Sequence, residues 1–152
     1  MANDVIYSSS LTLMSSYWSG ISQSLAKKVI DSYNSMVLDE LNSGYSVNYL
    51  DLAVMSSEFS KENTPLGRHY YQISRKLDLD YIVVEGILSR YSELIKDSLL
   101  RGTTVVVYGI IKFTPRDSCR VSVKSSSRFG DSKYKVRSKL NPFFKFELEK
   151  VS

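Results

Sequence analysis

Hydrophobic residues recur every three or four positions in two long stretches of the chain. The first stretch has apolar residues at Trp18, Ile21, Leu25, Val29, Tyr33, Val37 and Leu41. The second has them at Val84, Ile87, Leu88, Tyr91, Leu94, Ile95 and Leu99. A period near 3.6 is typical of an amphipathic α-helix. The pattern therefore predicts one helix from Trp18 to Leu41 and a second from Asp80 to Leu100.

Glycines and capping residues mark the ends of these predicted helices. Gly44 follows the first and Gly102 follows the second, and glycine just past a helix commonly takes the left-handed conformation that closes it. Arg101 places a positive charge at the negative end of the second helix dipole. Asp80 is the predicted N-cap of that helix. A shorter helix is predicted over residues 68–78.

The C-terminal third has the patterns of β-strands. Residues 103–113 predict one strand, bent or bulged at Gly109. The runs 119–124 and 133–140 each alternate apolar with polar or basic residues, and the turn-rich stretch 125–132 separates them. We therefore expect a long β-hairpin with one basic face.

Three other stretches lack a helical period. Residues 1–15 are Ser-rich and are expected to form an extended arm. Residues 45–55 are β-prone, and residues 56–67, which contain a proline and a glycine, are typical of a loop or linker. The chain is therefore divided into an arm (1–15), a helix and strand extension (16–67) and a C-terminal domain (68–152).

Residues 29–55 aligned on residues 87–113, at an offset of 58, share five identical residues. These pairs are Tyr33 with Tyr91, Asp39 with Asp97, Leu41 with Leu99, Gly44 with Gly102 and Val47 with Val105. Each segment reads as a helix, a glycine and a strand. Either the segments are a degenerate repeat, or they match because the same physics shapes any helix–glycine–strand unit.

Positive charge is concentrated at the end of the chain. The 152 residues have a net charge of +4. Residues 1–100 have a net charge of −4, whereas residues 101–152 carry 12 Lys/Arg and 4 Asp/Glu. This asymmetry indicates a polyanionic partner, with nucleic acid first, although a solvated basic face or contact with an acidic protein also fits.

The order of helices, glycine, bent strand, basic hairpin and Pro-Phe-Phe-Lys resembles the HU/IHF family of bacterial DNA-bending proteins. The resemblance covers residues 68–151. It rests on Arg101-Gly102, on Gly109 and Phe113, and on Pro142, Phe144 and Lys145, which match short motifs of that family. The implied fold class is α+β: an HU/IHF-like helix pair and saddle sheet with a long β-hairpin arm, preceded by a helix-containing N-terminal extension.

In that family two chains intertwine into one core, and two basic β-arms wrap double-stranded DNA. The resemblance implies a DNA- or partner-binding set on the hairpin here. Its members are Arg116, Arg120, Lys124, Arg128, Phe129, Lys133, Lys135, Arg137 and Lys139. The wedge proline of the family is missing from the tip. Phe129 could wedge between bases instead, or it could pack as a turn residue.

Two functions follow from the resemblance. The first is a structural protein of a phage virion, part of a head-to-tail portal or collar ring that contacts itself or neighbouring portal and tail proteins. HU/IHF-like domains occur in tailed-phage gene sets, and the missing proline and the long N-terminal region favour this reading. The second is an architectural protein of the cytoplasm or nucleoid that binds and bends duplex DNA with little sequence preference. The N-terminal region could cover its own domain, replace a second subunit or dock on another protein.

The sequence does not predict an enzyme. His69 is the only histidine and Cys119 the only cysteine, too few for a typical zinc site. His69 is expected on the surface at the start of a helix. We expect neither a metal nor a cofactor, and no catalytic residue.

The chain has no run of 18 apolar residues that would predict a membrane span, and its first residues do not resemble a signal peptide. The expected location is therefore the virion assembled in the host cytoplasm.

Overall fold

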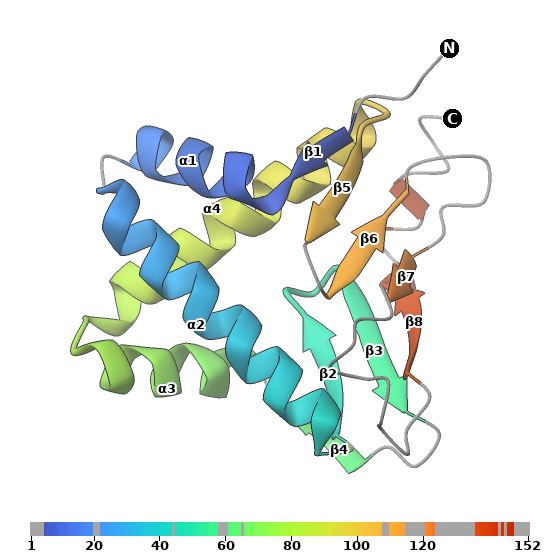
Figure 1. Ribbon diagram of the computed structural model, residues 1–152, viewed down its shortest axis with the longest axis horizontal. Coiled ribbons are helices and arrows are strands. Elements are labelled where there is room, and N and C mark those ends of the chain that lie inside the picture. Colours follow the sequence, from blue (N-terminus) through green and yellow to red (C-terminus); the bar gives the residue numbers. More distant parts are fainter. Residues whose placement is uncertain are drawn as a thin grey trace.

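The fold was analysed in a computed structural model of the 152-residue chain (Figure 1). The structure describes residues 5–19, 22–43, 45–57, 61–64, 66–107, 110–114, 121–123, 136–142, 144, 146 and 147. Its helices are α1 (Ser8–Ser19), α2 (Gln23–Asn42), α3 (Leu66–Leu77) and α4 (Tyr81–Leu100). Its strands are β1 (Val5–Tyr7), β2 (Tyr45–Tyr49), β3 (Ala53–Ser57), β4 (Lys61–Thr64), β5 (Thr104–Val107), β6 (Ile111–Phe113), β7 (Val121–Val123) and β8 (Val136–Leu140). The protein is therefore α+β, as the sequence predicts.

The same order of elements occurs twice along the chain. Unit 1 comprises β1, α1, α2, β2 and β3, and unit 2 comprises β4, α3, α4, β5 and β6. Helices α1 and α3 have 12 residues each, and α2 and α4 have 20 each. A shift of 58 positions carries both helices of unit 1 onto those of unit 2 without a gap. The offset found in the sequence is therefore an offset between equivalent structural elements.

The two described sheets have the same topology. One has the strand order β1-β5-β6-β7 and the other β4-β2-β3-β8. In the hairpins, Val47 pairs with Met55 and Val105 pairs with Phe113, which are equivalent positions at the offset of 58. The parallel pairs β1–β5 and β4–β2 match at one equivalent position, where Ile6 pairs with Val105 and Thr64 pairs with Val47, although β4–β2 has a register shift between Tyr45 and Val47. The two halves are thus related by a pseudo-twofold arrangement.

The units exchange elements. Strand β1 of unit 1 completes the sheet of unit 2, and β4 of unit 2 completes the sheet of unit 1. Helix α1 packs on α4 as well as on α2, and α3 packs on α2 as well as on α4. Figure 1 shows the helices on one side of the molecule and the sheets on the other. Within the helical side, the two long helices α2 and α4 cross each other. Neither unit can therefore form its sheet or cover its helices alone.

One hydrophobic core joins the units. It extends along the chain from Leu11 to Phe144. Six of the seven buried positions of α2 are equivalent to buried positions of α4. These pairs are Ala26 and Val84, Val29 and Ile87, Ile30 and Leu88, Tyr33 and Tyr91, Val37 and Ile95, and Leu41 and Leu99. The predicted periodicity is confirmed, and it places both apolar stripes in one shared core.

The predicted end of α4 is also confirmed. Gly102 has φ of +86°, and its N–H donates to the Leu99 carbonyl oxygen at 3.0 Å. The N–H of Thr103 donates to the Ser98 carbonyl oxygen at 2.9 Å. This pair of bonds is the Schellman motif, which requires the left-handed residue that glycine supplies without strain. Asp80 is the N-cap residue of α4, although its side chain makes no capping bond.

The prediction for the N-terminal residues is wrong. Residues 5–7 form β1 and residues 8–19 form α1, so residues 1–15 are not an extended arm. The first long helix begins at Gln23, not at Trp18, because Ser22 caps it by accepting a bond from the Leu25 N–H at 3.2 Å. The Ser-rich α1 has a weak intrinsic preference for helix. It is held by tertiary packing, with Leu11 fully buried.

Two strand predictions are also corrected. Residues 61–64, read as loop, form β4, a strand of polar residues held by backbone pairing with β2. Residues 103–113, read as one bent strand, contain two antiparallel strands, β5 and β6. The Ile110 N–H donates to the Val107 carbonyl oxygen at 3.0 Å and closes a tight turn between them. Gly109 itself lies outside the described residues.

The two strands of the predicted hairpin belong to different sheets. Among the described residues, β7 pairs with β6 and β8 pairs with β3, rather than with each other. The two strands nevertheless lie side by side where the sheets meet (Figure 1). They occupy equivalent outer positions of the two sheets. Each core hairpin offers a free edge that an added strand can pair with, and β7 and β8 satisfy these two edges.

Substitution of equivalent core positions should destabilise the whole protein equally. Ile30→Ala and Leu88→Ala each remove a fully buried side chain and should lower the free energy of unfolding by about 2–5 kcal/mol. Because the core is shared, urea unfolding followed by circular dichroism should show one transition that shifts in both variants.

The control is Ile82→Ala, because Ile82 on α4 is 80% exposed. It should change the stability by less than about 0.5 kcal/mol. Two separable transitions, with each core variant lowering only one of them, would contradict a shared core.

Candidate functional site

Most of the binding residues predicted from the sequence lie outside the described residues. These are Arg116, Arg120, Lys124, Arg128, Phe129, Lys133 and Lys135. The backbones of Arg137 and Lys139 are described in β8, where they face Ser56 and Val54 of β3. The hairpin-based site thus stays a prediction. The described part of the chain offers a different site, which the sequence did not indicate.

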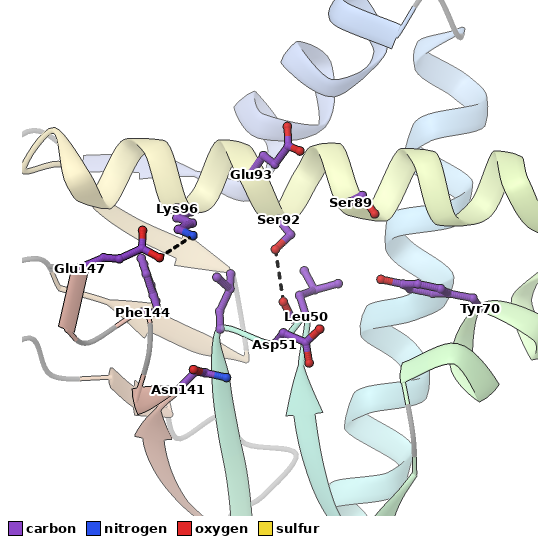
Figure 2. Close-up of a pocket in the computed structure, with 11 residues that line it drawn as sticks. Leu50, Asp51, Tyr70, Ser89, Ser92, Glu93, Lys96, Asn141, Phe144 and Glu147 are labelled. Atoms are coloured by element: carbon purple, nitrogen blue, oxygen red, sulfur yellow. Dashed lines mark hydrogen bonds and ion pairs between the residues drawn. The ribbon is translucent and has the colours of Figure 1, made fainter.

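This site is a cavity of about 320 Å³ between the two units. Figure 2 shows its walls: helix α4, the β2–β3 turn, Tyr70 of α3 and the segment that follows β8. Unit 1 contributes the turn and unit 2 contributes the helices. The C-terminal segment closes the side near Lys96. The cavity therefore exists only because the units pack together.

The β2–β3 turn has an unusual backbone. Leu50 and Asp51 have φ of 53° and 60°, and the Leu52 N–H donates to the Tyr49 carbonyl oxygen at 2.9 Å. Two successive left-handed residues are typical of a type I′ turn, which joins strands with the correct twist. Asparagine, aspartate and glycine favour this conformation, whereas leucine does not. Burial of Leu50 offsets its strain.

Tyr33 of α2 holds this turn in place. Its hydroxyl accepts a bond from the Leu50 N–H at 3.0 Å and lies 3.3 Å from the Asn48 carbonyl oxygen, to which it donates. Burial raises the pKa of this hydroxyl far above its ordinary value, so it stays protonated and keeps its donor. On the other side, the Ser92 hydroxyl of α4 donates to the Leu50 carbonyl oxygen at 3.2 Å (Figure 2). The turn is thus fixed between α2 and α4.

An ion pair and an aromatic ring form the opposite wall. Lys96 of α4 lies 3.0 Å from Glu147, and its ammonium is 5.9 Å from the centre of the Phe144 ring. The Asn141 N–H donates to the Leu52 carbonyl oxygen at 2.9 Å and attaches this segment to the turn. Phe144, which the sequence analysis assigned to a family motif, is buried here as part of the core.

The polar side chains that line the cavity are four charged groups and four neutral donors or acceptors. Burial, with a contribution from the Asp51 and Glu85 carboxylates, raises the pKa of Tyr70 to about 12. Its hydroxyl is therefore neutral at ordinary pH. The Asp51 carboxylate accepts a bond from the Asn48 side-chain amide at 2.6 Å. Among the described residues, Asp51 forms no ion pair. The cavity thus presents one carboxylate without a basic partner.

A smaller cavity of about 190 Å³ lies between α1 and α2 of unit 1 and shares three equivalent positions with the larger one. Its Thr12, Asp31 and Asn34 are the counterparts of Tyr70, Ser89 and Ser92, at the offset of 58. Here the carboxylate is paired, because Asp31 lies 2.8 Å from Lys27. The fold therefore contains two related cavities, and the charged residues that line them differ.

The prediction for His69 is wrong. Its side chain is fully buried, and Nε2 lies 2.9 Å from a carboxylate oxygen of Glu40 on α2. The ring also packs edge-on against Tyr33, with 5.7 Å between ring centres. The equivalent positions in the other half are Leu11 and Ser98. In the sequence His69 is a polar residue near the start of a predicted helix. In the fold, the face of α3 that carries His69 is directed toward α2.

The described residues contain no group of three or more His, Cys, Asp or Glu side chains that could hold a metal ion. In the same part of the chain, no helix is both long and apolar enough to cross a membrane. The described cavities offer carboxylates, hydroxyls and amides, which suit the binding of polar or charged groups.

Comparison of the chain with protein-family models, curated proteins and solved structures found no match.

The repeat was the one sequence signal that could have revealed the cavity. The offset of 58 aligns Leu50-Asp51 with Tyr108-Gly109. A glycine flanked by β-prone runs is a common sign of a tight turn. Interpreting both segments as hairpins would have placed Asp51 at a turn in unit 1. Ser92, Tyr70 and Glu147 gave no such signal, because their proximity depends on packing between distant segments.

Removal of the Tyr33 hydroxyl should destabilise the protein. In Tyr33→Phe the buried Leu50 N–H loses its acceptor, so the free energy of unfolding should fall by about 1–3 kcal/mol. The matched variant is Tyr91→Phe, at the equivalent position on α4. The Tyr91 hydroxyl is buried near Tyr49 and Asn34, but among the described residues it has no hydrogen-bond partner in good geometry. This variant should be neutral or slightly stabilising in urea unfolding. Equal losses in both variants would contradict the role of Tyr33.

The His69–Glu40 pair should show strong coupling. His69→Leu leaves the partly buried Glu40 carboxylate without its partner and should cost about 1–3 kcal/mol of stability. The double variant His69→Leu/Glu40→Ser copies the Leu11–Ser98 arrangement of the other half. It should recover most of that loss. A double-mutant cycle from thermal unfolding measures the coupling, and strictly additive losses would refute it.

Proposed function

We propose that this chain is a non-enzymatic structural protein that assembles head to tail with further copies of itself. The observation that supports the proposal is the completed pseudo-twofold core within one chain. In many small α+β proteins such a core requires two subunits, but here each unit supplies the strand and helix that the other lacks. The described core is therefore buried between the two units of a single chain.

The distribution of charge supports assembly between unlike surfaces. Residues 116–139 contain eight Lys/Arg and two Asp/Glu, a net charge of +6, and the rest of the chain has a net charge of −2. This segment occurs once, after unit 2, and unit 1 has no counterpart. A single basic segment on one molecule and an acidic surface on the next make a heterologous contact. Such contacts produce closed rings or open filaments.

The setting we propose is the virion of a tailed phage. There the chain would be part of a portal or collar ring where the phage head joins the tail, assembled in the host cytoplasm. The support is the resemblance of residues 68–151 to the HU/IHF family, whose fold also occurs in phage gene sets. In that reading unit 1 takes the place of the second subunit of the HU/IHF dimer. Its neighbours in the particle would be portal or tail proteins.

The second candidate function is binding and bending of double-stranded DNA. The net charge of +6 on residues 116–139 favours it, because basic residues release counterions when they contact phosphates. Against it stands the number of basic segments. The DNA-bending dimers wrap the duplex with two arms, and this pseudo-dimer has a single segment of that kind.

Two measurements on the purified full-length chain separate these functions. Light scattering after size-exclusion chromatography and negative-stain electron microscopy should show rings or short filaments as protein concentration rises, because the contacts are heterologous. A salt-titrated assay with a 30-base-pair duplex should show no submicromolar binding at physiological salt. A monomer at all concentrations that binds duplex with a steep loss on added salt would refute the structural role and support DNA binding.

A further inference from the structure

We propose that the 320 Å³ cavity between α4 and the β2–β3 turn binds a basic side chain from residues 116–139 of a second copy of this chain. This inference rests on the proposed function, because it assigns the acceptor surface of the head-to-tail contact. The ligand class is an ammonium or guanidinium group.

The first argument is the charge left in the cavity after its internal pairs are formed. Lys96 is neutralised by Glu147 at 3.0 Å, and Glu93 at the rim lies 3.0 Å from Arg90. Asp51 is the remaining carboxylate, and it forms no ion pair with a described residue. Figure 2 shows the hydroxyl end of Tyr70 pointing toward the turn that carries Leu50 and Asp51. An incoming cation would find one unpaired carboxylate with neutral hydroxyls next to it.

The second argument is the backbone conformation of Asp51. Its φ of 60° lies in the left-handed region, which glycine occupies without strain. At the equivalent position in unit 2 the chain has Gly109. Unit 1 thus carries a carboxylate where the turn would accept a glycine. Aspartate, like glycine and asparagine, accommodates this conformation, so the turn holds the carboxylate at this position without marked strain.

The third argument is the contrast with the smaller cavity in unit 1. There the carboxylate of Asp31 is already paired with Lys27 at 2.8 Å. That cavity is also smaller, at about 190 Å³ against about 320 Å³. Of the two related cavities, only the larger one combines a closed wall with an unpaired carboxylate. A basic ligand would therefore distinguish between them.

The occupant we assign is another copy, on the basis of charge and connectivity. Residues 116–139 carry a net charge of +6, the strongest basic segment in the sequence. Within one molecule the segment enters β8 at Val136, which pairs with Ser57 at the end of β3 remote from the cavity. The end of β8 beside the cavity is Leu140, paired with Ala53. A second molecule can approach the open side of the cavity without this restriction.

The test is Asp51→Asn in the full-length chain. Asparagine keeps the side-chain shape, tolerates the left-handed backbone and still accepts from Asn48, so the fold should be preserved. We expect the dissociation constant for self-association, measured by sedimentation velocity, to rise at least about tenfold. The control Asp39→Asn removes the same charge from an exposed position of α2 outside the cavity and should change it by less than about twofold.

Carbodiimide cross-linking identifies the partner group, because the reagent joins carboxylates to lysine amines in direct contact. In a mixture of ¹⁵N-labelled and unlabelled protein, we expect Asp51 to be joined to a lysine of residues 124–139 in peptides that contain both isotopes. Cross-linked peptides of a single isotope, with no mixed-isotope peptides among them, would show that the segment occupies the cavity of its own molecule, which overturns the inference.

The outcomes separate this inference from the proposed function. If the chain assembles and Asp51→Asn behaves like Asp39→Asn, the cavity is not the acceptor, but the structural role stands. If the chain stays monomeric or binds only duplex DNA, both proposals fail. Weakened assembly in Asp51→Asn alone, with the mixed cross-link, supports both.

Discussion

The structure depends on the exchange of elements between its two units. Each unit has a long helix with an apolar stripe, and α2 and α4 bury these stripes in one core. Each unit also gives its first strand to the other's sheet, so that β1 pairs with β5 and β4 pairs with β2. An isolated unit would expose both the stripe and a strand edge, which are unfavourable in water. The position of every other element, including the turn at Leu50, follows from this mutual burial.

Features set by residues close together in the sequence could be predicted, whereas features set by contacts between distant segments could not. The long helices could be found because their buried positions repeat at short spacing, and the Schellman end at Gly102 could be found because it is a local motif. Strand β4 could not, since Lys61–Thr64 are polar and owe their conformation to backbone pairing with β2. Helix α1 could not, since its serines favour helix only weakly and its burial depends on α4. The cavity was missed for the same reason, because Tyr70, Asp51 and Glu147 come from three distant segments.

The pseudo-twofold arrangement makes the differences between the units informative. Positions that fill the core keep their apolar character, as Ile30 and Leu88 do. Among the equivalent pairs that change in kind are Leu11 with His69, Glu40 with Ser98, and Asp51 with Gly109. The first two changes occur together, because His69 and Glu40 contact each other at 2.9 Å and Leu11 and Ser98 take their places in the other half. The Asp51 change has no such compensating partner within the described part of the molecule.

A single-chain pseudo-dimer also removes a restriction that symmetry places on a true homodimer. Two identical subunits present every surface twice, so a basic segment and an acidic acceptor would each occur on both sides of the axis. Joining the units in one chain lets the two sides differ. Here residues 116–139 follow unit 2 only, and the unpaired carboxylate of Asp51 belongs to unit 1 only. The donor and acceptor surfaces that we propose would give the molecule a direction, and a direction is what an assembly through unlike surfaces requires of its subunit.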